Sequence, residues 1–262
     1  MLEGSARKEL IDIAQSARIF AKDELRQRIA DGAIGVFWIF LAPLLQLAVF
    51  YFVFVELFQA RSAGVNNYLV FLSIGFWPWL AFSETVVRCT PLLVEKAGIA
   101  GKVRISRIGM FTGVAFTSFS FHVAGFVLVL LVLSCWGEVT ISTNWLLLPI
   151  LWAALFAFSF SIAIIFSLLN VFIRDTARIV GLFLTLWFFT TPIFYPASSL
   201  PSFSSNLQAY NPLGVIIAIN RDLVQGREVS SLSSPSIILI CSAFALAVFL
   251  YRRVRFELEE FS

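Results

Sequence analysis

Few ionisable side chains lie in the apolar parts of this 262-residue sequence, and their types and spacing limit its chemistry. Glu84 and Arg88 are four residues apart, so on a helix they could pair on one face. His122 is a single histidine in an apolar run, where it is typically a hydrogen-bonded packing residue. Proton relays and ion sites need several ionisable groups inside the bilayer. Because the sequence shows no carboxylate pair, metal-ligand cluster or nucleophile–base arrangement, we expect no catalytic or metal site.

A nucleotide site is also not expected. The segment from Gly98 to Lys102 superficially resembles a phosphate-binding loop. However, two residues separate its glycines where that loop has four, and Val103 stands where Ser or Thr would bind magnesium. We therefore expect no cofactor on this chain, and any energy for transport has to come from a partner or from a gradient of the substrate.

The elements that position these groups are apolar helices. The chain is 59% hydrophobic and 13% charged, whereas soluble domains carry about 25% charged residues. This composition excludes a soluble protein, and we expect an all-α integral membrane fold with six crossings. A crossing needs about 20 apolar residues, and the six candidate runs are 34–57, 68–87, 108–136, 145–173, 179–195 and 235–251. The fifth is the shortest and ends at Pro192 and Pro196.

The distribution of Lys and Arg predicts the orientation. Sixteen of the 19 lie in the N-terminal region, the 88–107 region, the 174–178 turn or the C-terminus. With six crossings these four regions lie on one side of the membrane, and only Arg61, Arg221 and Arg227 lie on the opposite side. By the positive-inside rule, both termini are in the cytoplasm and residues 196–234 lie outside.

Two cytoplasmic segments are candidates for contacts outside the membrane. Residues 1–33 combine an apolar stripe with surrounding basic residues, which predicts an amphipathic helix at the membrane surface; the alternative is an ordinary helix packed on protein. Its selected basic residues are Arg18, Lys22, Arg26 and Arg28. The residues of the 90–107 loop allow two interpretations. The loop is either a surface on which a partner docks or a solvated turn whose positive charge only sets the topology. Its selected residues are Leu92, Leu93, Glu95, Lys96, Lys102 and Arg104.

The outer segment 196–234 contains a short helix signal. Asn211 can cap a helix whose first residue is Pro212, and about 13 residues are too few to cross. Because Arg221 lies in this run, we expect a re-entrant or interfacial gate helix that meets water or a polar pore. Aromatic residues suggest an interfacial belt or, alternatively, a pore wall on which sugar rings stack. The selected aromatics are Trp77, Trp79, Trp187, Phe188, Phe194 and Tyr195.

Gly109 and Gly113 form a GxxxG motif at the start of the third run. This motif permits close helix approach, either within one chain or between two copies.

Together these features resemble the permease subunit of ABC-2 type exporters, most closely the branch that exports O-antigen, capsule or teichoic acid chains. The resemblance covers nearly the whole chain. It is most specific at Arg174-Asp175 after the fourth run and at Thr191-Pro192 near the end of the fifth. Other matching residues are Asn211-Pro212-Leu213, Arg221, Arg26, Arg28, Ile34, Gly35, Trp38 and Pro43. The sequence departs from the family where Ile29 replaces a tyrosine and where the 98–102 segment lacks a Phe-Pro step.

The resemblance implies a homodimer of six-helix permeases in the bacterial inner membrane. Two ATP-binding subunits, carrying ATP and magnesium, would dock against residues 1–33 and 90–107. The transmembrane domain would be 34–252, with 253–262 as a cytoplasmic tail. The cargo would be a polysaccharide on an undecaprenyl-type lipid; membrane lipids are further partners, and nucleic acid is not. The alternatives are an ABC-2 exporter of a small lipid or drug, and a membrane enzyme of lipid-linked sugar metabolism.

Overall fold

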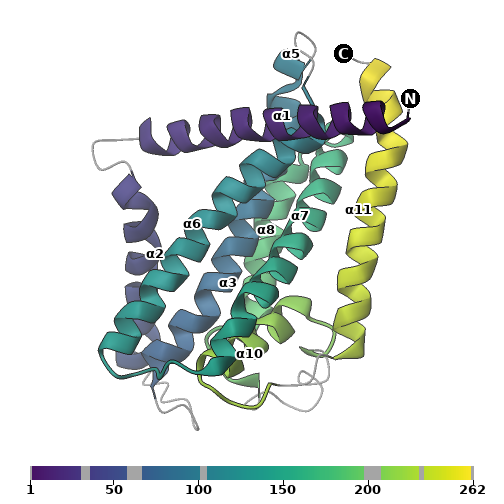
Figure 1. Ribbon diagram of the computed structural model, residues 1–262. Helices are drawn as coiled ribbons and strands as arrows, with labels where there is room; N and C mark the ends of the chain where they lie inside the picture. Colours follow the sequence, from purple (N-terminus) through teal and green to yellow (C-terminus); the bar gives the residue numbers. More distant parts are fainter. Residues whose placement is uncertain are drawn as a thin grey trace.

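The computed structural model describes residues 2–30, 36–57, 67–100, 105–197, 208–229 and 233–260, and within these ranges all regular structure is helical. Helix α1 (Leu2–Ala30) lies across one end of a bundle, and both chain termini are at this end (Figure 1). The bundle helices are α2 (Val36–Tyr51) with the π-helix η1 (Phe52–Leu57), α3 (Tyr68–Cys89), α6 (Arg107–Cys135), α7 (Leu148–Phe172), α8 (Thr176–Thr190) and α11 (Ser234–Glu260). The short elements are α4 (Leu92–Glu95), α5 (Ala97–Ala100), the 3-10 helix η2 (Thr143–Leu147) and α10 (Pro212–Val224).

Among the described residues, five helices are long and apolar enough to cross a membrane. They correspond to five of the six expected runs, which confirms an all-helical fold with five candidate membrane spans in this part of the chain. Helix α8 is apolar but has 15 residues and ends at Thr190 instead of Tyr195. Thr191 adopts an extended conformation there because Pro192 disfavours a helical residue before it. A sixth crossing is therefore not established by length.

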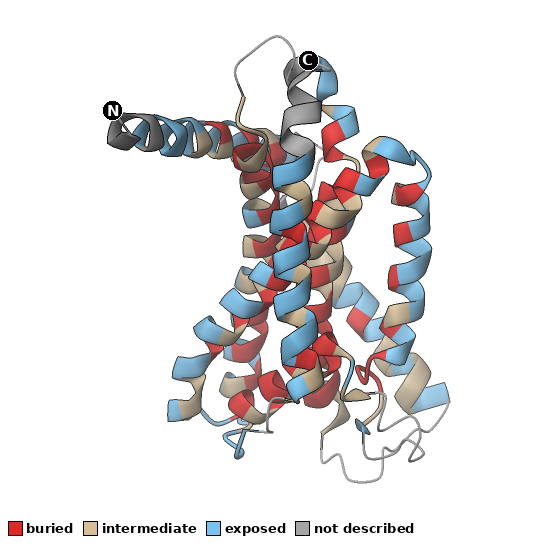
Figure 2. Ribbon diagram, turned by 90° about the vertical axis from the view of Figure 1, so that its right-hand side faces the viewer, coloured by how far each residue is buried: buried red, intermediate tan, exposed pale blue. Residues whose placement is uncertain are grey.

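Helix α3 is the centre of the bundle. In the most apolar stretch of Tyr68–Glu95, which includes α3, 78% of the residues are buried. The corresponding shares are 6% for Phe37–Leu57 and 11% for Ser234–Arg253. Figure 2 shows the buried residues gathered along the centre and the outlying helices mostly exposed. The exposed side chains of α2 and α11 are largely apolar, including Phe37, Trp38 and Phe249. In a membrane such surfaces face lipid or another apolar helix.

Helix α1 packs closely on α6 at the GxxxG motif. A Cβ atom added to Gly109 would collide with the carbonyl oxygen of Ile13, and one added to Gly113 would collide with that of Ala17. The motif therefore serves a contact within one chain, which resolves one of the two alternatives that the sequence leaves open.

Candidate functional site

An ionic cluster of Glu24, Arg28, Glu84, Arg88 and His122 joins α1 to α3 and α6 at the α1 end of the bundle. The Arg28 guanidinium donates to Glu24 Oε1 at 2.9 Å and also to Glu84. Arg88 returns to Glu24, with Nη2 2.7 Å from Oε1. His122 Nε2 lies 2.6 Å from Glu84 Oε2. The expected pairing of Glu84 with Arg88 is thus replaced by partners on neighbouring helices.

The charged core of this cluster is buried. Glu24 is 6% exposed and Arg28 is 9% exposed. Arg28 also donates to Ser118 Oγ at 2.8 Å and lies over the Phe121 ring, 5.2 Å from its centroid. Buried charges are tolerated when they are paired and hydrogen-bonded. The cluster therefore fixes α1 against the bundle, because removing one partner leaves a buried charge unpaired.

Helix α1 has two different faces. Ser16, Phe20, Glu24 and Arg28 are buried at four-residue spacing, which is one helix face. The packed-helix alternative is confirmed for this face, and placing Arg28 among the surface basic residues was wrong. The other selected basic residues, Arg18, Lys22 and Arg26, are exposed. Several apolar residues are also exposed, and their contact with a membrane stays a prediction; they are Leu10, Ile19, Leu25 and Ile29.

The 90–107 loop is partly built into the bundle. Leu92 and Leu93 are buried in the core, so the prediction that they contact a docking partner is wrong. Glu95 is exposed, whereas Lys96 Nζ binds Asp23 Oδ2 of α1 at 3.0 Å. Lys102 and Arg104 lie outside the described residues. The loop and α1 thus form one connected surface at the α1 end.

Helix α10 begins at the opposite end of the bundle with the predicted cap. The Asn211 side chain accepts from the Gly214 N–H at 3.2 Å, and Pro212 occupies the first turn. Trp187 Nε1 also donates to Asn211 Oδ1 at 3.0 Å, and Asn211 Nδ2 donates to Thr191 Oγ1 at 3.1 Å. The predicted short helix is confirmed, and its cap ties it to the end of α8.

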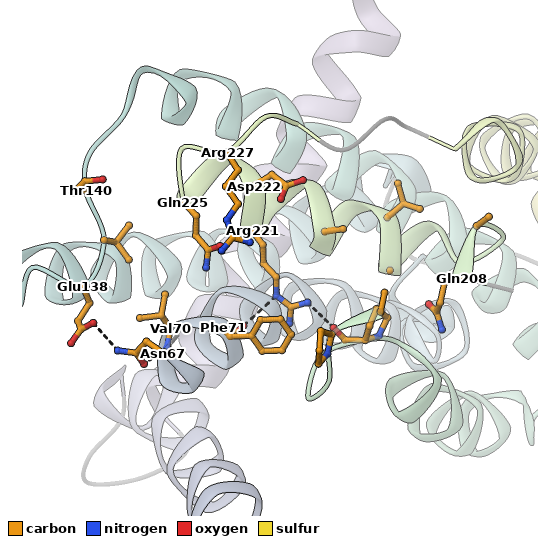
Figure 3. Close-up of a pocket in the computed structure, with 18 residues that line it drawn as sticks. Asn67, Val70, Phe71, Glu138, Thr140, Gln208, Arg221, Asp222, Gln225 and Arg227 are labelled. Carbon is orange, nitrogen blue, oxygen red and sulfur yellow. Dashed lines mark hydrogen bonds between the residues drawn. The ribbon is translucent and has the colours of Figure 1, made fainter. Parts of the chain in front are cut away.

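Arg221 is buried beneath α10 (Figure 3). Its guanidinium donates to the carbonyl oxygens of Phe71 at 3.3 Å, Pro192 at 2.7 Å and Ile193 at 2.9 Å. It also stacks on the Phe71 ring at 3.5 Å from the centroid. Burial lowers the pKa of Arg221 to about 9, so it remains charged at neutral pH. We call Arg221 and these three carbonyls the Arg221 site; it is an internal structural contact, not the water-facing arginine expected from the sequence.

Two irregularities of α3 receive the side chains of α10. Pro78 lacks an N–H, so the carbonyl of Ile74 has no partner within the helix. Asn220 Nδ2 donates to this carbonyl at 3.0 Å, and its Oδ1 accepts from Trp152 Nε1 at 3.1 Å. Gly75 leaves the space that the Arg221 guanidinium occupies. Helix α10 therefore replaces hydrogen bonds that α3 cannot make itself.

Most selected aromatic residues lie inside the chain. Trp77, Trp79, Phe188 and Phe194 are each 9% exposed or less. Phe188 lies 5.3 Å from Trp79 and 4.8 Å from Phe194, centroid to centroid. Neither a membrane belt nor a pore wall fits these four residues, because they are buried inside the chain, where the rings of Trp79, Phe188 and Phe194 pack together.

The remaining selected residues near the α10 end line an open cavity of about 1020 Å³ between α7, α8, α10 and α11. They are Trp187, Tyr195, Asn211 and Pro212. The Tyr195 hydroxyl donates to the carbonyl of Phe189 at 3.0 Å. Of the residues expected to form the pore and gate, these four line this cavity.

The turn between α7 and α8 carries the selected pair Arg174 and Asp175 on the surface. Asp175 Oδ1 accepts from Arg178 at 3.2 Å, in an exposed contact. Asn170, which was not selected, accepts from the Ala177 N–H at 3.1 Å and is buried. Glu24 was not predicted either, although its position four residues before Arg28 is typical of a helical ion pair.

Comparison with known proteins gives a consistent result. Residues 15–223 match the family described as ABC-2 type transporter. The chain is 30% identical over 207 residues to the O-antigen export system permease protein RfbA of Klebsiella pneumoniae, covering 78% of each. It is 27% identical over 233 residues to the protein of that name from Myxococcus xanthus, covering 85% and 87%. It is 23% identical over 207 residues to the polysialic acid transport protein KpsM of Escherichia coli, covering 79% and 80%.

Proposed function

This chain belongs to the ABC-2 type transporter family, and from that premise we propose that it is the membrane permease of an ATP-driven polysaccharide exporter. The observation that carries the proposal is the length of the match: about four fifths of the chain aligns with about four fifths of proteins named as O-antigen and polysialic acid export components. The apolar helices supply the membrane domain, and we place the protein in the bacterial inner membrane.

The energy source in this proposal is a separate ATP-binding subunit, present in two copies. We place it at the α1 end, which we take as cytoplasmic because most positive charge lies there. The exposed Glu95 and the Lys96–Asp23 bridge make the 90–107 loop and α1 one surface on which such a subunit can act. The ionic cluster then connects that surface to α3 and α6.

The membrane arrangement in this proposal has six crossings in each of two identical subunits. Helix α8 is the short crossing, completed by the turn at residues 191–195. The apolar exposed faces of α2, α8 and α11 would meet lipid and the second copy. Helix α10 and its flanking segments would form the outer gate. The cargo is a polysaccharide on an undecaprenyl-type lipid.

The direct test removes the gene from cells that make this protein. We expect lipid-linked polysaccharide to accumulate inside and surface polysaccharide to disappear, with both restored by the wild-type chain. Normal surface polysaccharide without any internal accumulation would refute polysaccharide export. Loss of a small lipid or drug from the medium instead would assign the chain to the other ABC-2 cargo class.

A further inference from the structure

We propose that a pocket at the α10 end binds a neutral, hydroxyl-rich sugar unit of the exported polysaccharide; this inference rests on the proposed function. The pocket has a volume of about 620 Å³, within the range of about 300–1,000 Å³ typical of small-molecule sites. Its walls come from the start of α3, the turn after α6, the turn after α8, and α10 with its following turn (Figure 3). We call it the α10-end pocket.

Its lining offers hydrogen-bond donors and acceptors side by side. Asn67 Nδ2 donates to Glu138 Oε2 at 2.7 Å, which orients the carboxylate and leaves Oε1 to accept. Among the residues that the structure describes, the side-chain amide of Gln225 makes no hydrogen bond and lines the same pocket. An amide both donates and accepts, as each sugar hydroxyl also does. This mixture matches a polyol better than a ligand with one kind of hydrogen-bonding group.

The charge of the lining disfavours a phosphate or another strong anion. Glu138 and Asp222 carry negative charge, and Arg221 and Arg227 carry positive charge, so the lining is neutral in total. The Arg221 guanidinium is already bound to carbonyl oxygens of the Arg221 site. A phosphate would meet two carboxylates, with Arg227 as the remaining cation of the lining. Within the described residues, no group of three or more His, Cys, Asp or Glu side chains could hold a metal ion to offset this repulsion. A neutral sugar avoids this desolvation and repulsion.

The pocket is held in shape before any ligand binds. Gly226 adopts φ 65°, which turns the chain after α10 so that Gln225 and Arg227 both line the pocket. The Gln225 N–H donates to the Arg221 carbonyl at 2.9 Å, and the Arg227 carbonyl accepts from Asn144 at 3.1 Å. Preorganisation of this kind reduces the ordering cost of binding.

The position of the pocket gives it a role on the exit side. It lies at the end of the bundle opposite α1, which is the outer end in the proposed orientation (Figure 1). A sugar unit held there is one that has already crossed. The α10-end pocket would therefore retain the emerging chain while the permease resets.

The test measures binding of a sugar probe to the purified transporter, including its ATP-binding subunit, in lipid nanodiscs. The probe is delipidated surface polysaccharide, released by mild acid from the cells that make this protein. We expect Glu138→Ala and Gln225→Ala each to weaken binding about 3- to 10-fold, as loss of one net hydrogen bond predicts. Glu228→Ala is the matched control, on an exposed position that does not line the pocket, and it should bind like the wild type.

Two outcomes overturn the inference. The first is no binding by the wild-type transporter, or binding that the two pocket variants leave unchanged. The second is displacement of the probe by inorganic phosphate, which would assign the pocket to anions. If gene removal abolishes surface polysaccharide as expected, either of these results refutes the pocket alone. If surface polysaccharide stays normal after gene removal, the proposed function itself is refuted.

Discussion

Arg28 and Arg221 are two buried arginines at opposite ends of the bundle, and their charges are stabilised in different ways. Arg28 binds the carboxylates of Glu24 and Glu84, one on its own helix and one on α3. Arg221 binds backbone carbonyls and an aromatic ring. Carboxylates on side chains can exchange partners by rotation, whereas carbonyls hold an arginine only while the backbone keeps its shape. The difference predicts that the ionic cluster tolerates the loss of one partner better than the Arg221 site, which fixes the backbone around it.

The largest effect should come from removing Arg221. Arg221→Met leaves three carbonyls without their donor, and each unsatisfied buried group costs about 1–3 kcal/mol. We expect a loss of about 5 kcal/mol and little folded protein. Thermal unfolding in detergent measures this, with the exposed Arg227→Met as the matched control. If Arg221→Met melts like that control, the Arg221 site does not hold the backbone.

Removing Arg28 should have a smaller effect, because the cluster has a second cation. In Arg28→Met, Arg88 still pairs with Glu24, while Glu84 keeps His122. We expect a loss of about 3 kcal/mol, concentrated in α1, and faster hydrogen exchange there than in α10. The exposed Arg18→Met is the control.

A double variant then tests whether the partners are interchangeable. Adding Glu84→Gln to Arg28→Met should recover part of the loss, since it removes a carboxylate that has lost its arginine and keeps only His122. Additive losses would instead show that the ionic cluster is as rigid as the Arg221 site.

Gly75→Ala tests the Arg221 site without touching the arginine. The added Cβ would collide with the Arg221 guanidinium, and forced overpacking costs about 1–3 kcal/mol. We expect a loss of about 2 kcal/mol in the same melting experiment. Gly181→Ala is the control, because its Cβ would meet no atom within 4 Å. Equal melting temperatures for the two variants would contradict the close approach.

The smallest effect on stability should come from Glu95→Lys on the exposed part of the 90–107 loop. This change should leave the melting temperature unchanged and reduce co-purification of the ATP-binding subunit. Glu228→Lys, exposed beyond α10, should alter neither property. Full co-purification with Glu95→Lys would place the partner elsewhere.

Local signals were readable from the sequence, and contacts between distant residues were not. The Asn211-Pro212 cap was predictable because a cap involves residues only three apart. The burial of Trp77 was not, because an apolar helix does not reveal which face meets lipid and which meets protein. The Arg28–Glu84 contact joins residues 56 apart, so its existence depends on how α1 lies across α3 and α6. The resemblance to a family located important segments but not the direction of their side chains.

The position of α1 in the chain also bears on biosynthesis. Arg28 leaves the ribosome 56 residues before Glu84 and 90 residues before Ser118, two groups that it binds in the finished structure. Helix α1 therefore cannot complete these contacts until α6, which carries Ser118, has been made and inserted. During that interval Glu24 and Arg28 can satisfy each other as a pair on one helix face. The exposed Leu25 and Ile29, four residues apart on one face, give the undocked helix an apolar edge that can contact the bilayer surface.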